Sequence, residues 1–164
     1  MRIIGEEETR RWLSERGLLD STGEFSFSGF VKAIDSQIPA DSGRKTIISR
    51  EIVSLFETDK ESLLWINEYG IFLAFEDRNL FEGFRTSLGE HSPLHEKPGH
   101  LFSGNDLKNV QSLVAMILYF VWGGILYSPP SRLAIKIDHH SYITIFVKDK
   151  ASAASINEML KKYL

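Results

Sequence analysis

Four residues near the ends of predicted strands have side chains suited to acid–base chemistry: Glu68, His100, Asp138 and His139. In a catalytic arrangement, Asp138 would orient His139 as a general base, and Glu68 and His100 would converge on it from other strand ends. Such a set predicts a small hydrolase or nuclease. The competing interpretation is structural: Asp138 and His139 are ordinary residues of a hairpin turn, and His100 is half-buried with its ring nitrogens bonded to the backbone.

The segment from Glu90 to Ser103, EHSPLHEKPGHLFS, contains three histidines and is predicted to be a long loop. Imidazole is the commonest metal ligand. However, Pro93 and Pro98 prevent a helix from aligning His91 with His95, and neither an HExxH pattern nor a cysteine accompanies them. We therefore predict no metal and no cofactor.

The stretch PADSGRKT is similar to a phosphate-binding loop but departs from it at two positions. Ile38 stands where the first glycine is required, and Arg44 separates Gly43 from Lys45. The two cations still fall in the first turn of a predicted helix, where the dipole favours anions. Arg44 and Lys45 could thus hold an anionic ligand or an acidic side chain of a partner, as in an anion or phospho-metabolite sensor. The simpler interpretation, which we favour, is that Asp41 and nearby glutamates neutralise them on a solvated surface.

The three tryptophans are predicted to have different environments. Trp65 and Trp122 stand in apolar runs and are expected in the core. Trp12 belongs to a polar helical segment, residues 6–16, which we expect at the edge of the fold. We therefore predict that Trp12 is exposed and contacts a protein partner.

Periodicity and turn residues predict the order helix, strand, helix, strand, two helices, three strands, helix. Helices are expected at residues 6–16, 41–56, 79–88, 105–121 and 151–164. Strands are expected within 23–39 and 62–72 and at 124–128, 132–137 and 142–147, the last two joined as an antiparallel hairpin.

Helical connections are typical of parallel neighbours. We therefore predict an α/β or α+β fold: a mixed sheet of about five strands with helices packed on it, ending in the antiparallel hairpin and the C-terminal helix. No linker or internal repeat divides the chain, so residues 1–164 are expected to form a single globular domain.

Composition excludes several classes of function. A formal net charge of −3 provides no basic field for a polyphosphate backbone, so nucleic-acid binding is not expected. The chain has no cysteine, which excludes disulfides, thiolate metal sites and cysteine nucleophiles and fits a reducing compartment. The N-terminus lacks the apolar run of a signal peptide. These features predict a cytoplasmic protein.

The one candidate membrane segment is residues 109–131, which carry no charged side chain. Gly123, Gly124, Pro129 and Pro130 leave it with a continuous apolar core shorter than the roughly 20 residues of a spanning helix. We therefore favour a buried helix followed by a buried strand, and no membrane association.

Five segments, PADSGRKT, LLWINEYG, NLFEGFRTSLGE, PGHLF and IDHHSYI, together resemble a recurring pattern in a group of small bacterial proteins. The resemblance spans residues 38–143 and implies a stand-alone bacterial domain, but it supplies neither an activity nor catalytic residues. Because the chain carries no complete catalytic signature, we favour a non-enzymatic domain that binds a protein partner, of an accessory or toxin-neutralising type. The hydrolase or nuclease and the anion sensor are the alternatives, and the sequence leaves the oligomeric state open.

Overall fold

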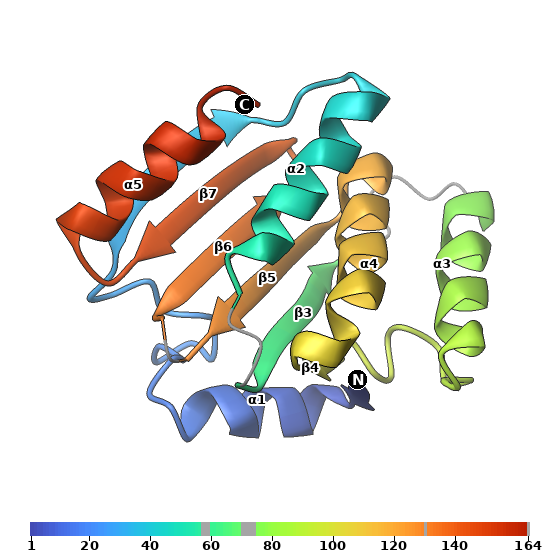
Figure 1. Ribbon diagram of the computed structural model, residues 1–164. Helices are drawn as coiled ribbons and strands as arrows, with labels where there is room; N and C mark the ends of the chain where they lie inside the picture. The colour runs from blue at the N-terminus through green and yellow to red at the C-terminus, as the bar shows by residue number, and fades with distance from the viewer. Residues whose placement is uncertain (57–59, 70–74, 130, 164) are drawn as a thin grey trace.

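The computed structural model describes residues 1–56, 60–69, 75–129 and 131–163 (Figure 1). Within them, one seven-stranded sheet has the order β1-β4-β3-β5-β6-β7-β2, and every neighbouring pair is antiparallel. The strands are β1 (Arg2–Ile4), β2 (Val31–Gln37), β3 (Ser62–Glu68), β4 (Gly99–Phe102), β5 (Gly123–Ser128), β6 (Leu133–Asp138) and β7 (Tyr142–Val147). The helices are α1 (Glu6–Ser14), α2 (Ser42–Ser54), α3 (Phe75–Ser87), α4 (Leu107–Phe120) and α5 (Lys150–Leu160), with a 3₁₀ turn at Gly104–Asp106.

The sheet differs from the predicted one in two respects. It has seven strands rather than about five, because β1 and β4 are three and four residues long, too short for periodicity to reveal. It is also antiparallel throughout rather than mixed. The helical connection between β4 and β5 does join two strands of the same direction, but β3 lies between them and runs the other way.

Helix boundaries follow from local chemistry. The Asp41 carboxylate accepts a hydrogen bond from the Arg44 amide at 2.8 Å, so it caps the first turn of α2. Helix α4 ends at Val121, whose φ of 57° is left-handed and turns the chain directly into β5. Helix α3 begins at Phe75, earlier than the predicted start near Asn79.

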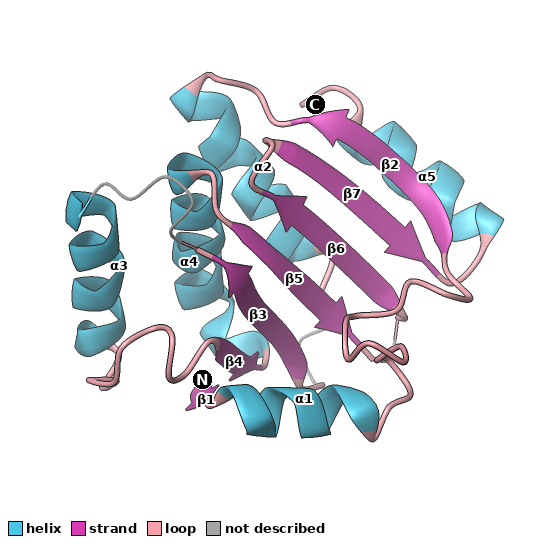
Figure 2. Cartoon of the chain, turned by 180° about the vertical axis from the view of Figure 1, so that it is seen from behind, coloured by secondary structure: helices cyan, strands magenta, loops and turns pink. Residues whose placement is uncertain are grey.

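The two faces of the sheet are covered differently. Helices α2, α4 and α5 lie on one face, and α3 lies beside α4 (Figure 1). The core between this face and the helices includes Ile52, Leu64, Val110 and Ile135, all with no exposed surface. On the opposite face, only α1 and the segment that follows it cover one end of the sheet (Figure 2). Within the described ranges, no helix lies on the rest of this face.

The segment proposed above as a buried helix followed by a buried strand forms α4 and β5, and every residue of β5 is buried. Among the described residues, no helix is both long enough and apolar enough to cross a membrane.

Candidate functional site

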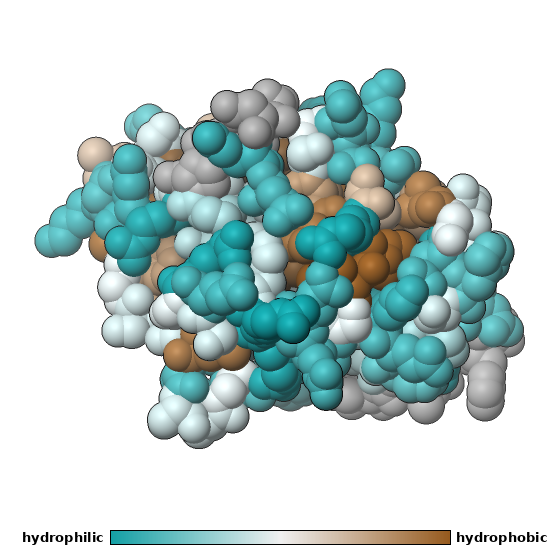
Figure 3. All heavy atoms as spheres, turned by 90° about the horizontal axis from the view of Figure 1, so that it is seen from below, coloured by the Kyte–Doolittle hydropathy of each residue, from teal (hydrophilic) through white to brown (hydrophobic). Residues whose placement is uncertain are grey.

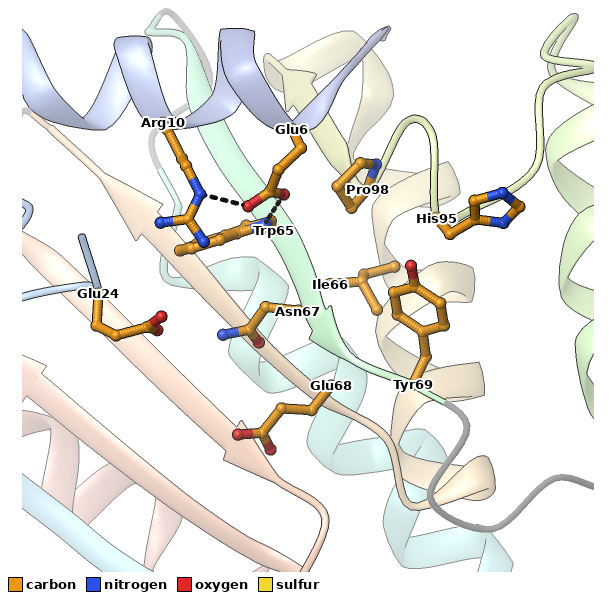
Figure 4. A pocket seen from close by; sticks show the side chains of 10 residues that line it. All are labelled: Glu6, Arg10, Glu24, Trp65, Ile66, Asn67, Glu68, Tyr69, His95 and Pro98. Carbon is orange, nitrogen blue, oxygen red and sulfur yellow. Dashed lines mark hydrogen bonds and ion pairs between the residues drawn. The ribbon is translucent and has the colours of Figure 1, made fainter. Parts of the chain in front are cut away.

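A pocket of about 520 Å³ lies where α1 crosses the sheet, and we call it the α1 pocket (Figure 4). Three of its side chains are carboxylates, two are large aromatic rings and one is a guanidinium. Its lining residues are Glu6, Arg10, Glu24, Trp65, Ile66, Asn67, Glu68, Tyr69, His95 and Pro98. The pocket therefore combines acidic groups with aromatic surface.

One end of the pocket is held by a closed set of contacts between α1 and β3. The Glu6 carboxylate accepts hydrogen bonds from Arg10 Nε at 2.6 Å and from Trp65 Nε1 at 3.0 Å. Arg10 also donates to the Gly23 carbonyl, and its guanidinium lies 5.2 Å from the centre of the Trp65 ring. Because these contacts already use both charged groups, Glu6 and Arg10 balance each other (Figure 4).

The other end of the pocket is built around Glu68. The register between β3 and β5 shifts between Trp65 and Glu68, which indicates a bulge in β3. Bulges re-aim side chains, and this one turns Glu68 toward the face that carries Trp65 (Figure 4). There the Glu68 carboxylate lies over Gly123 of β5 and contacts His139 Nδ1 at 2.9 Å. The His139 and His140 rings lie 4.0 Å apart.

The structure thus brings together two of the four residues predicted for acid–base chemistry, Glu68 and His139. Asp138 does not orient His139. Its carboxylate accepts hydrogen bonds from the backbone amides of His140 and Tyr142, at 2.9 and 3.2 Å, and so stabilises the hairpin turn. His100 belongs to β4, where its Nδ1 lies 3.1 Å from the Pro98 carbonyl. It is fully buried rather than half-buried.

Burial dominates the chemistry of His100. Removal of the ring from water, reinforced by the positive charge of Arg85, lowers the pKa of His100 from 6.5 to about 3. The ring is therefore neutral in the folded protein, whereas in the unfolded chain it takes up a proton below about pH 6.5. A neutral ring enclosed in the core has no route to a substrate.

Acidification should therefore destabilise the protein through His100. The free energy of unfolding is expected to be highest above pH 6.5 and to fall as the pH drops toward 3, with a slope from this residue of at most about 1.4 kcal/mol per pH unit. Urea unfolding of wild type and of His100→Asn at a series of pH values measures this slope. The variant should lose the part that begins near pH 6.5. His91→Asn, at an exposed position, should retain it.

Arg44 and Lys45 line a different hollow, of about 650 Å³. It lies at the C-terminal end of β2, which is an edge strand of the sheet. Ser36, Gln37 and Ser141 add polar groups to it. Among the described residues, neither cation forms an ion pair with a carboxylate: Asp41 binds the Arg44 backbone, and Lys45 Nζ lies 5.6 Å from the Tyr119 ring centre. The neutralisation that we favoured from the sequence is therefore not the arrangement found.

Trp12 is not exposed. Its side chain is 7% exposed, because α1 turns it toward the sheet, where it packs edge-on against Tyr127. Its Nε1 donates to Glu61 at 3.0 Å, and the Arg16 guanidinium covers the ring at 3.7 Å. The predicted role of Trp12 as an exposed contact residue is therefore wrong. The molecular surface on the side where α1 lies, seen from below, is mostly hydrophilic around a compact hydrophobic area (Figure 3).

No family model matches this sequence, and no curated protein or solved structure shows significant similarity to the chain. Within the described part of the chain, no three His, Asp or Glu side chains lie close enough to hold a metal ion.

Sequence reasoning missed the α1 contribution to the site. In the sequence, Glu6 and Arg10 are simply part of the polar helical segment 6–16, and no local pattern indicates that this helix lies across β3. A usable signal was present in Trp65, because the indole N–H of a buried tryptophan usually finds an acceptor. Here that acceptor is Glu6.

Proposed function

We propose that this chain is a non-enzymatic binding protein whose α1 pocket receives a basic side chain, arginine or lysine, of a protein partner. The observation that carries the proposal is the charge of the pocket. Glu24 and Glu68 add two carboxylates to it, and Arg10, its one guanidinium, is already balanced by Glu6. A cationic group would supply the missing charge.

The aromatic surface of the pocket favours the same ligand. A guanidinium is attracted to the face of an aromatic ring, and Arg10 already lies over Trp65 in this manner. Tyr69 and Asn67 add a second ring and an amide to the lining of the pocket (Figure 4). An incoming arginine side chain could thus stack on the Tyr69 ring, form an ion pair with a carboxylate of the pocket and donate a hydrogen bond to the Asn67 amide oxygen.

The lining argues for binding rather than turnover. Among the described residues that line it, none is a serine, threonine or cysteine, and Tyr69 contributes the one hydroxyl group. Glu68 and His139 bond to each other at the rim. We propose that this pair holds the Glu68 carboxylate in place for a cation, so that the protein acts as an accessory or neutralising partner of a basic protein.

The proposal is tested by titration with N-acetyl-arginine amide, followed through the tryptophan indole N–H signals in ¹H–¹⁵N NMR spectra. Trp65 Nε1 donates into the pocket, so its signal should move on binding, whereas those of Trp12 and Trp122 should stay in place. The citrulline analogue has the same shape without the charge and should produce no comparable shift. A Glu24→Gln/Glu68→Gln double variant should weaken binding about ten-fold or more.

Glu158→Gln is the matched control, because Glu158 is exposed on α5 outside the pocket. Equal shifts with arginine and citrulline, or unchanged binding by the double variant, would contradict the proposal. The runner-up function, a hydrolase or nuclease, draws support from the 2.9 Å contact between Glu68 and His139. Turnover of an ester or phosphodiester by the wild type, lost in His139→Ala, would favour it instead.

A further inference from the structure

The two edges of the sheet are very unequal. Strand β1 forms one edge and is three residues long. Strand β2 forms the other edge and is seven residues long, so it offers about 23 Å of strand on its outer side (Figure 2). An edge strand of this length presents a row of backbone donors and acceptors to any strand that can approach it.

The register of β2 shows which backbone groups face outward. The Ile38 amide donates to the Ser141 carbonyl at 2.7 Å. Alternate residues of an antiparallel strand bond to the same neighbour, so Ser36 also faces β7 while Gln37 and Asp35 direct their N–H and C=O groups outward. The register shift at Ala33 leaves Lys32 opposite Phe146, two β7 positions beyond the partner of Asp35. Lys32 therefore faces outward as well.

Two of the residues whose backbone groups face outward, Lys32 and Asp35, carry side chains of opposite charge. Lys32 and Asp35 form an ion pair at 2.9 Å, and their side chains are 54% and 48% exposed. Charged residues on an edge strand discourage pairing with an arbitrary strand. They favour a strand with the complementary pattern, and β2 itself has that pattern when it runs in the opposite direction.

We propose that a second copy of this chain pairs with the first through β2, antiparallel and about a twofold axis that passes between Ala33 and Ile34, at the register shift. This register places Lys32 of each copy opposite Asp35 of the other, so that two cross-strand ion pairs form. The bulge occurs at related positions in both copies and fixes the register. On the helix side, α5 packs along β2, and a groove of about 210 Å³ lies between them. The dimer joins two sheets into one continuous sheet.

The complementary charges allow a test that separates contacts between copies from contacts within one chain. Wild type should sediment as a dimer at the upper end of a concentration series. Lys32→Asp and Asp35→Lys each place like charges opposite each other in a homodimer, so each variant alone should dissociate about ten-fold or more readily. An equimolar mixture of the two variants should restore the dimer, because every position then faces its opposite charge.

Both variants lose the same ion pair within the chain, so circular dichroism and thermal unfolding will show whether each is folded. Lys108→Asp, which changes charge on the exposed side of α4, should leave the dimer unchanged. Wild type that stays monomeric throughout the series would overturn the proposal. Single variants that remain dimeric, or a mixture that fails to associate, would do the same.

Discussion

Replacing Gly123 with alanine is expected to break the contact between Glu68 and His139 and to weaken binding of an arginine side chain about ten-fold or more. A Cβ at position 123 would lie 2.7 Å from Glu68 Cβ and 3.0 Å from Glu68 Cδ. Glu68 and Gly123 face each other across the β3–β5 ladder, so the backbone offers no room for both side chains. The clash should also lower the free energy of unfolding by about 1–3 kcal/mol.

Urea unfolding and the NMR titration with N-acetyl-arginine amide measure the two effects. Gly83→Ala is the control, because a Cβ at this exposed position in α3 would meet no atom within 4 Å. It should instead raise stability by about 0.5–1 kcal/mol and leave binding unchanged. A Gly123→Ala/Glu68→Ala double variant should regain stability but not binding. If Gly123→Ala binds arginine as wild type does, Glu68 does not form the site.

Replacing Arg85 with methionine should produce the largest loss of stability, about 2–4 kcal/mol of the free energy of unfolding. Arg85 is fully buried, and burial lowers the pKa of its guanidinium. Its two terminal nitrogens donate to the carbonyls of Ser92 and Lys97 at 3.2 and 2.8 Å. Methionine fills similar space but leaves both carbonyls without a donor, so the segment between α3 and β4 loses its attachment.

Arg50→Met is the matched control, because the Arg50 side chain is 61% exposed and forms its ion pair with the adjacent residue Glu51. It should change the free energy of unfolding by less than about 0.5 kcal/mol. Amide exchange across residues 90–98 should accelerate in the Arg85 variant and not in the control. Equal stability of the two variants would show that the Arg85 hydrogen bonds contribute little.

The helices and the long strands could be predicted because each carries a complete local signal. Asp41 caps α2, and the apolar spacing of Ile48 and Ile52 marks its buried face. The hairpin of β6 and β7 follows from a short turn between two apolar runs. These features depend on residues close together in the sequence, which periodicity and turn chemistry describe well.

The features that could not be predicted depend on contacts between distant segments. Strand β4 exists because Gly99–Phe102 fits between β1 and β3, and four residues carry no period of their own. Trp12 is buried because α1 lies on the sheet, although its helix is polar. The meeting of Glu68 with His139 requires the bulge in β3, which no local pattern marks.

The same strand order has a consequence for how the chain reaches its native state. Strand β2 ends at residue 37, whereas its neighbour β7 begins at residue 142, so pairing them closes a loop of more than one hundred residues. Such distant pairing gives the fold a high contact order, and high contact order slows folding. During synthesis, β2 emerges first and must wait for nearly the whole chain before β7, its neighbour in the sheet, is available.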